Sequence, residues 1–546
     1  MKYSILFIVF FFVYVFQIKA QNYYWIAFTD KNNTNYSLDN AGEYLSERAI
    51  ERRERQNIAI DSLDLPVNSW YVDSVLSLDV EFVHASKWLN GITVKTDVDS
   101  LDKIIPDWYF VKEIQLTKPA LTNKSSSNKF TVEREFDNGV IDTSLYGGSV
   151  HQVSMLEGQF LHQQNFKGQG IQIAVLDGGF LNVNSYSAFD SLWINNQILG
   201  TKDIVNPNSD IYTTHYHGMS VLSCMGGNIP GELIGTAPKA SYWLIRSEDV
   251  FSEYMVEEDH WVNAAEFADS AGVDIINSSL GYYEFDDSTT NHTYADMDGN
   301  TTRVTRAANI AASRGILVFA SAGNERDDSW QRIIAPSDGD LVVGVGAVDK
   351  ELNPAYFTSA GPAFGGAIKP NVSAMGYHTT LQLSNGNIGM SNGTSFSSPV
   401  LAGMAACLWQ RYPDKTAAEI KTALEKSAHM YLTPDSLVGY GVPNMRTASE
   451  ILDPLSVQLY ENNQKWQVYP NPVGKRIVIQ YVGNTIQKEI NIEMYSLAGQ
   501  LIQQWIKPAS PTIVLTQIPV FVTGMFLLRI NDGQNSETFK LTKSNW

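Results

Sequence analysis

The chain has 546 residues, of which 44% are hydrophobic, so it holds enough apolar material for two to four folded units with at least one large core. Its 39 Lys and Arg residues against 58 Asp and Glu residues give a formal net charge of -19. This acidic balance argues against nucleic acid or an anionic membrane surface as a partner.

The N-terminal segment is typical of a secretory signal peptide. Lys2 precedes an apolar run over residues 3–16, and Ala20 supplies the small residue expected before a cleavage site. A membrane anchor is the alternative, but the run is shorter than the roughly 20 residues that cross a bilayer. We therefore expect residues 1–20 to be removed during export.

Residues 21–117 are expected to form a small α+β domain. An apolar strand is followed by a charged segment whose apolar residues recur at helical spacing. Asn90 and Gly91 then predict a tight turn between two strands, and a last strand is predicted near residues 109–116. Residues 118–149 are polar and irregular, which predicts an exposed linker that proteases can cut.

Residues 150–455 alternate short apolar runs with helix-like segments. Buried strands that alternate with helices predict an α/β fold, a mostly parallel sheet with helices on both faces. In such a sheet, functional groups gather at the carboxyl ends of the strands. Asp177 and Asn324 stand where two apolar runs, IQIAVLD and ILVFASAGN, end.

Two cysteines, Cys224 and Cys407, lie in apolar segments of this central region. So few cysteines exclude a disulfide scaffold, and the stability must come from the core. Buried free thiols are the favoured interpretation, and one disulfide is the alternative.

Residues 466–546 differ in character from the central region. A short polar stretch precedes them, and they contain several short alternating apolar runs separated by turns. Several short strands in a segment of this length predict a small C-terminal β-sandwich.

Hydrolysis of a peptide bond by serine needs a hydroxyl nucleophile, an imidazole that takes and returns its proton, and a carboxylate that fixes the imidazole tautomer. Asp177 fits the carboxylate, because it ends an apolar strand and two glycines follow it. A carboxylate buried without partners is costly, which favours a functional role. A strand-end cap is the structural alternative.

His217 is the candidate imidazole. It stands with Gly218 at the start of an apolar, helix-like run. His217 is preferred to His215 because its imidazole then sits at a helix entry, where the glycine leaves open space beside it. A surface histidine or a hydrogen-bonded core histidine is the structural alternative.

Ser395 is the candidate nucleophile. Gly393 permits a sharp turn and Pro399 suits the first turn of the helix that follows, whose dipole stabilises negative charge near the serine. A helix N-cap is the structural alternative. Asn324, at a strand end after Gly323, offers an uncharged amide that can donate to an oxyanion, and a turn asparagine is its alternative.

Together these segments resemble the subtilisin-like serine proteases, whose motifs follow the order D-x-G, H-G-x-x-x-A, S-x-G, A-G-N and G-T-S-x-x-x-P. The resemblance covers about residues 165–450. The matching segments here are DGG from Asp177, HGMSVLS from His217, SLG from Ser279, AGN ending at Asn324 and GTSFSSP from Gly393.

The resemblance implies a role for each matched residue. Asp177 would orient His217, which acts as general base and then as general acid while Ser395 attacks the scissile carbonyl. Asn324 and the backbone amide of Ser395 would hold the oxyanion. The substrate backbone would pair with an extended segment beside the specificity pocket. The substrate-binding residues that the resemblance implies are Ser279, Leu280, Gly281 and Gly323.

The flanking regions fit the same family. Residues 21–117 stand where the family carries a propeptide that assists folding and inhibits the enzyme. The C-terminal region, with YPNPV, YSLAGQLI and GMFLLRI, resembles the sorting domain that the type IX secretion system of two-membrane bacteria reads. An adhesive or carbohydrate-binding sandwich is the alternative. We expect a protein that is secreted or held at the cell surface after export across an outer membrane.

The implied chemistry requires no cofactor, and no metal ligand is assigned. Family members often bind structural calcium, and Asp296, Asp298 and Asn300 in DMDGN offer oxygens at alternate positions. The segment lacks the bidentate glutamate of an EF-hand, so a plain turn is favoured. The expected partners are protein or peptide substrates, the chain's own propeptide and the secretion machinery. We expect a monomer.

Three functions stay open at this stage. A secreted serine endopeptidase is favoured, because all four reactive residues are present. The alternatives are a catalytically silent binding or adhesion protein on the same fold and a dedicated maturation protease with narrow specificity. Substrate preference depends on the pocket floor, which we expect near residues 327–338.

Overall fold

A computed structural model describes two compact units, Met1–Leu452 and Asp453–Trp546. The described residues are 21–97, 101–105, 107–120, 145–453 and 465–543, the last range without 472, 483–488, 497–498, 517, 520–523 and 534–535. The predicted signal peptide and most of the predicted linker lie outside them. Within the described ranges, no helix is both long and apolar enough to cross a membrane.

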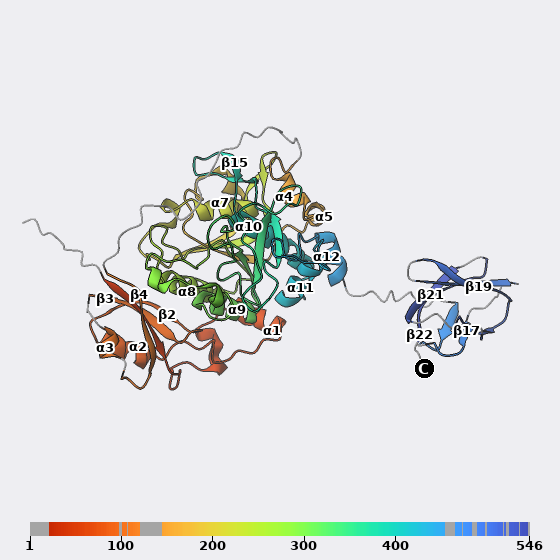
Figure 1. The fold of residues 1–546 in the computed structure, drawn as a ribbon, viewed down its shortest axis with the longest axis horizontal. Coiled ribbons are helices and arrows are strands. Elements are labelled where there is room, and N and C mark those ends of the chain that lie inside the picture. Colours follow the sequence, from red (N-terminus) through yellow and green to blue (C-terminus); the bar gives the residue numbers. More distant parts are fainter. Residues whose placement is uncertain are drawn as a thin grey trace, which may run out of the picture. The chain divides into compact units, whose positions relative to one another are not determined.

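Seven parallel strands form the central sheet of the first unit, in the order β13-β12-β11-β10-β5-β9-β6. Figure 1 labels the helices that lie around this sheet. The strands are β5 (Gln172–Asp177), β6 (Ile198–Asp203), β9 (Ser241–Arg246), β10 (Ile275–Ser278), β11 (Leu317–Ser321), β12 (Val343–Val348) and β13 (Val372–Met375). The chain runs from β5 to the strands on one side of it and then returns to β10 on the other. This reversal creates a crevice at the carboxyl ends of β5 and β10.

Helices cover both faces of this sheet, which confirms the predicted fold class. One face carries α7 (His217–Gly226), α10 (Thr394–Arg411), α11 (Ala417–Ser427) and α12 (Met445–Leu452), and the other carries α8 (Val256–Ala271) and α9 (Arg303–Ser313). Along β5, Ile173 and Val175 enter the first core, whereas Ala174 and Leu176 enter the second. This alternation follows from the two-residue period of a strand and explains why β5 is apolar throughout.

Shorter elements complete the first unit around this sheet. They are η1 (Leu38–Glu43), α4 (Val150–Ser154), α5 (Gln159–Gln163), η2 (Ser187–Phe189), α6 (Asp190–Ile194), η3 (Ile211–Thr213), β7 (Asn228–Ile229), β8 (Leu233–Ile234), η4 (Ser288–Thr290), η5 (Tyr294–Asp296), β14 (Thr379–Gln382) and β15 (Ile388–Ser391).

The N-terminal region, residues 21–120, has the predicted α+β architecture. Its antiparallel sheet has the order β2-β3-β1-β4, with β1 (Asn22–Phe28), β2 (Glu81–Ser86), β3 (Gly91–Thr96) and β4 (Val111–Lys118), and its helices are α1 (Glu47–Arg55), α2 (Ser69–Leu76) and α3 (Leu101–Ile104). The predicted turn joins β2 to β3, with Asn90 at a φ of 53°. The last strand ends at Lys118, two residues beyond its predicted end.

Buried ion pairs join the N-terminal region to α8. The carboxylate of Asp269 is fully buried and accepts hydrogen bonds from Arg52 (2.5 Å), Arg53 (2.9 Å) and Lys87 (2.9 Å). Burial by itself would raise the pKa of Asp269, but Lys87, Arg52 and Arg53 together lower it well below its usual range. We call this group of four residues the junction cluster.

A second carboxylate of α8 caps the end of β2. Glu266 accepts hydrogen bonds from the Ser86 hydroxyl (2.5 Å) and from the backbone N–H groups of Lys87 (2.9 Å) and Trp88 (3.1 Å). The Trp88 side chain enters the hydrophobic core under α8 and α9. The N-terminal region is therefore held by charge pairs, by backbone hydrogen bonds and by a shared apolar core.

The second unit consists of two antiparallel sheets around one hydrophobic core, as predicted for the C-terminal region. One sheet contains β16 (Trp466–Tyr469), β17 (Ile477–Tyr481) and β20 (Thr512–Leu515). The other contains β18 (Glu489–Tyr495), β19 (Leu501–Pro508), β21 (Gly524–Asn531) and β22 (Ser536–Lys543). Alternating residues of both sheets, such as Ile479 and Ile492, fill the core between them.

The two cysteines are separate, buried thiols. Cys224 donates to the carbonyl oxygen of Ser220 (3.5 Å), and Cys407 donates to that of Thr236 (3.1 Å). Burial raises the pKa of both thiols, so they stay protonated. The favoured interpretation of free core thiols is confirmed, and the disulfide alternative is wrong.

Candidate active site

Asp177 and His217 meet where β5 ends and α7 begins. The fully buried Asp177 carboxylate accepts from Nδ1 of His217, at 2.8 Å to one oxygen and 3.0 Å to the other. Gly218 makes this approach possible, because a Cβ atom there would lie 2.5 Å from the Gly179 carbonyl oxygen and 2.8 Å from the Asp177 Cβ. Because a carboxylate only accepts, this contact places a proton on Nδ1 of His217.

His215 has a different position and a different role. Its Nδ1 accepts the backbone N–H of His217 at 3.2 Å, so it contacts the start of α7. Burial, with added repulsion from His217 and Arg246, lowers the pKa of His215 to about 3. His215 therefore stays neutral over the range in which proteins function, whereas His217 has the carboxylate partner.

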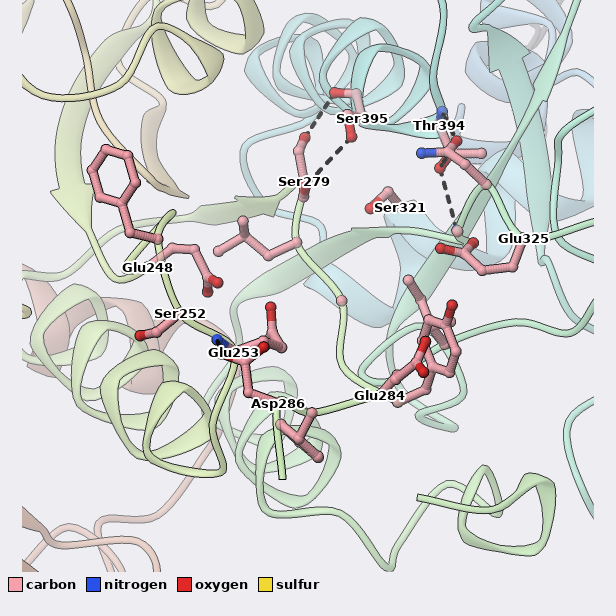
Figure 2. Close-up of a pocket in the computed structure, with 18 residues that line it drawn as sticks. Glu248, Ser252, Glu253, Ser279, Glu284, Asp286, Ser321, Glu325, Thr394 and Ser395 are labelled. Atoms are coloured by element: carbon pink, nitrogen blue, oxygen red, sulfur yellow. Dashed lines mark hydrogen bonds between the residues drawn. The ribbon is translucent and has the colours of Figure 1, made fainter. Parts of the chain in front are cut away.

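Ser395 is the second residue of α10 and is partly exposed. Its Oγ donates to the carbonyl oxygen of Ser279 (3.4 Å), and the Ser279 hydroxyl donates to the Ser395 carbonyl oxygen (2.8 Å). Figure 2 shows both contacts at the start of the helix. The rings of His217 and Phe396 lie 5.9 Å apart, which brings α7 beside the first turn of α10.

Asn324 faces the same helix start from the end of β11. Its Oδ1 accepts both the backbone N–H (2.9 Å) and the hydroxyl (3.0 Å) of Thr394. The Thr394 hydroxyl in turn accepts the Gly323 N–H at 3.2 Å. Because the amide oxygen has two donors on α10, the NH₂ group is the end of Asn324 that can donate to a ligand.

A pocket of about 420 Å³ opens beside Ser395. Five of the residues assigned from the sequence line it together with Ser395: Ser279, Leu280, Gly281, Gly323 and Asn324. Gly323 has a φ of 109°, which favours glycine, and a Cβ atom there would lie 2.7 Å from the Glu325 carboxylate. Asp177 and His217 are not among the residues that line this pocket.

The pocket floor differs from the sequence expectation. Of residues 327–338, only Ile334 lines the pocket. Ser321, Glu325 and Thr394 also line it. The rest of the wall comes from two loops, which contribute Glu248, Phe251, Ser252 and Glu253 after β9, and Tyr283, Glu284, Phe285 and Asp286 after β10. The signal that could have identified them is their place just beyond the carboxyl ends of two strands of the parallel sheet.

Glu325 is the carboxylate nearest in sequence to Asn324. Its Oε2 accepts the Ser359 hydroxyl at 3.0 Å. Burial raises the pKa of Glu325 to about 7; the hydrogen bond from Ser359 opposes this rise and the charge of Asp328 adds to it. This carboxyl group therefore changes its charge near neutral pH.

Asn277 contacts the Ser279 segment and α10, and it was not among the site residues predicted from the sequence. It is buried on β10, where its Nδ2 donates to the Ser279 hydroxyl (3.2 Å) and its Oδ1 accepts the Ser398 hydroxyl (2.8 Å). It thus connects β10, the Ser279 segment and α10. An asparagine inside the apolar run VDIINSS was the available signal, since buried amides need partners.

The carboxylates of the DMDGN segment accept hydrogen bonds from nearby backbone groups. Asp298 accepts the N–H groups of Asn300 (2.8 Å) and Thr301 (2.8 Å), while Asp296 accepts the N–H of Thr293 (2.7 Å). The carboxylate oxygens of Asp296 and Asp298 therefore cap the turns in which these two residues lie. Over the described part of the chain, no group of three or more His, Cys, Asp or Glu side chains is arranged to hold a metal ion.

Comparison with family models gives three matches along the chain. Residues 168–441 match the model described as the Subtilase family. Residues 23–132 match the peptidase S8 propeptide domain of Bacteroidota, and residues 467–544 match a secretion system C-terminal sorting domain.

Individual relatives are distant. The chain is 28% identical to subtilisin E of Bacillus subtilis (strain 168) over 313 residues, which are 56% of this chain and 72% of that protein. It is 27% identical to the serine protease AprX of the same strain over 355 residues, 59% of this chain and 74% of that protein. Among solved structures, MycP1 from Mycobacterium smegmatis is similar, with 21% identity, 55% of this chain and 84% of that chain covered, and a TM-score of 0.41.

Proposed function

The chain belongs to the Subtilase family of serine proteases, and on that premise we propose that it is an endopeptidase with Asp177, His217 and Ser395 as its catalytic triad. The observation that carries this proposal is the contact of the buried Asp177 carboxylate with His217 Nδ1, at 2.8 Å and 3.0 Å. A carboxylate so placed fixes the tautomer and stabilises the imidazolium that forms during the reaction.

The reaction then proceeds in two halves. His217 Nε2 takes the proton of the Ser395 hydroxyl as its Oγ attacks the scissile carbonyl carbon, and the same imidazole protonates the leaving amine. The product of this half is an acyl group on Ser395. A water molecule, deprotonated by His217, then attacks the acyl carbon and releases the carboxylic acid while the proton returns to Ser395.

Two donors stabilise the negative charge that develops on the carbonyl oxygen. We assign them to the Asn324 NH₂ group and the backbone N–H of Ser395. Thr394 supports this assignment, because its two hydrogen bonds to Asn324 Oδ1 hold the amide in one orientation before substrate binds. The position of Ser395 in the first turn of α10 adds the favourable helix dipole.

The extended segment of Ser279, Leu280 and Gly281 is proposed to pair with the substrate backbone, with Gly323 on the opposite side of the pocket. The segment lies at the pocket wall, and Ser279 is already hydrogen-bonded to the start of α10. Pairing of main chains supplies affinity, while side-chain pockets supply specificity.

The flanking domains serve delivery and control. The matched families supply a propeptide and a sorting domain that implies export across an outer membrane. We propose residues 21–117 as an inhibitory propeptide, 118–149 as the linker that is cut, 150–455 as the peptidase domain of a monomer and 466–546 as the sorting domain. The buried contacts of the junction cluster support a propeptide that folds together with the peptidase domain.

Substitution of the proposed nucleophile tests this function. Ser395→Ala should lower the hydrolysis of denatured casein by at least about 10⁴-fold, because the residual rate comes only from binding and the oxyanion donors. Mass spectrometry should find the N-terminal region removed from the wild-type protein and retained in the variant. Equal hydrolysis and equal processing by both proteins would instead indicate a non-catalytic protein on the same fold.

A further inference from the structure

The pocket beside Ser395 is strongly acidic. Five carboxylates line it: Glu248, Glu253, Glu284, Asp286 and Glu325. Among the described residues that form its wall, none is Lys or Arg. A cleft lined by charges of one sign concentrates ligands of the opposite sign and repels like charges.

Glu325 lies at the end of the pocket that Asn324 also lines. It directly follows Asn324, and its carboxylate packs against Gly323 and Ser359. A substrate carbonyl held between Asn324 and Ser395 places the side chain of that same residue in this end of the pocket. Because Gly323 has no side chain, the carboxylate is accessible from the pocket on that side.

Glu248 and Glu253 lie on the other side of the segment from Ser279 to Gly281, as Figure 2 shows. Glu248 is held there by the Tyr282 hydroxyl, which donates to its carboxylate at 2.9 Å. A substrate strand that pairs with the Ser279 segment directs alternate side chains to the same face. The acidic groups are thus positioned along the part of the substrate that precedes the cleaved bond.

The N-terminal region already places a cation at this rim. Lys118, at the end of β4, donates from Nζ to the hydroxyl of Ser252 (3.0 Å), a pocket residue, and lies 3.8 Å from Asp249. The ammonium group also lies 5.9 Å from the ring centroid of Tyr23 and 5.4 Å from that of Tyr254. The rim therefore binds an ammonium group within the chain itself.

We propose that this protease selects substrates with a basic side chain immediately before the cleaved bond, received by Glu325, and that the acidic loops after β9 and β10 favour further basic residues upstream. The inference rests on the proposed function and names its substrate class: cationic polypeptides. Opposite charges in a partly buried pocket strengthen binding, and an acidic side chain there is repelled by the carboxylates.

Matched peptides test the inference. Two internally quenched peptides of one sequence differ only in the residue before the cleaved bond, which is Arg in one and Leu in the other. For the secreted wild-type protein at pH 8, we expect kcat/KM to be about tenfold or more higher for the Arg peptide, the ratio that one well-formed charge pair supplies.

Three variants locate the effect. Glu325→Gln should lower kcat/KM for the Arg peptide by about tenfold and leave the Leu peptide within about twofold, because only the cation loses its partner. Glu325→Asp, which keeps the charge, should retain the preference for Arg. Glu351→Gln removes the same charge from an exposed site outside the pocket and should change neither peptide.

The outcomes separate the two proposals. If the wild-type protein cleaves the Leu peptide as fast as the Arg peptide, or if Glu325→Gln slows both equally while Glu325→Asp slows neither, the specificity inference is wrong and the protease function stands. If the wild-type protein cleaves neither peptide and leaves casein intact, the proposed function itself is wrong.

Discussion

Two fully buried carboxylates of the first unit have opposite kinds of partner. Asp177 contacts the imidazole of His217, a group that can gain and lose a proton. Asp269 contacts two guanidinium groups and an ammonium group, all of them from residues 52–87. The permanent cations hold two regions of the chain together, whereas the titratable partner suits proton transfer. The chemistry of a buried carboxylate is thus decided by its partner.

The carboxylates of the pocket beside Ser395 also differ in their partners from the carboxylates that contact the N-terminal region. At the contact with the N-terminal region, Asp269 and Glu266 of α8 accept hydrogen bonds from that region. At the pocket, the carboxylates of the loops after β9 and β10 and of Glu325 meet no Lys or Arg among the described lining residues. The chain therefore supplies Lys and Arg partners to Asp269 at the junction, whereas no Lys or Arg is among the described residues that line the pocket.

The largest effect is expected at Asp177. Asp177→Asn should lower kcat by about 10⁴-fold, because an amide no longer fixes the required tautomer of His217 or stabilises the imidazolium. The free energy of unfolding should change little, since the amide keeps the size of the side chain. Rates on the Arg peptide and urea unfolding of the same preparation check both statements. A rate within tenfold of the wild type would remove Asp177 from the triad.

Asp269→Asn should lower the free energy of unfolding of the precursor, the quantity that Asp177→Asn leaves almost unchanged. Removing the shared charge leaves Arg52, Arg53 and Lys87 buried with less counter-charge, which costs about 3–5 kcal/mol of precursor stability. The measurement is urea unfolding of the precursor that carries Ser395→Ala, so that it stays uncut. The pKa of Asp269 is lowered by folding, so its stabilisation is complete above about pH 4 and is lost as the pH falls further.

Glu54→Gln is the matched control for that measurement. Glu54 lies on the exposed side of α1, the helix that supplies Arg52 and Arg53. Its substitution should change the free energy of unfolding by no more than about 0.5 kcal/mol. An equal loss in both variants would show that the junction cluster contributes only through net charge.

The smallest effect concerns pH. Because the pKa of Glu325 is raised to about 7, its carboxyl group is largely neutral at pH 6 and charged at pH 8. The ratio of kcat/KM for the Arg and Leu peptides should rise severalfold, up to about tenfold, between these values. The ratio cancels any effect of pH that the two peptides share. The charges of Asp328 and Asp327 both act to raise the pKa of Glu325. A kcat/KM ratio that does not change with pH in the wild type would contradict the assignment of this effect to Glu325. In the Glu325→Gln variant, the ratio should not change with pH.

Much of the fold could be predicted from the sequence, because the relevant signals are local. The alternation of apolar strands with helix-like segments predicted the parallel sheet, and the Asn90-Gly91 pair predicted the β2–β3 turn. The segments with Asp177, Asn324 and Ser395 were located because glycine-containing motifs mark strand ends and helix starts. Residue type and spacing within about ten positions were sufficient for each of these.

The tertiary structure alone decided which groups meet. His217 and His215 stand two residues apart in the sequence. Only the fold gives His217 the Asp177 carboxylate and leaves His215 as a neutral, half-buried ring. Arg53 and Asp269 are 216 positions apart. The pocket carboxylates come from loops after three different strands. Pairing and burial over such distances depend on how the strands are ordered in the sheet, which no local pattern of residues encodes.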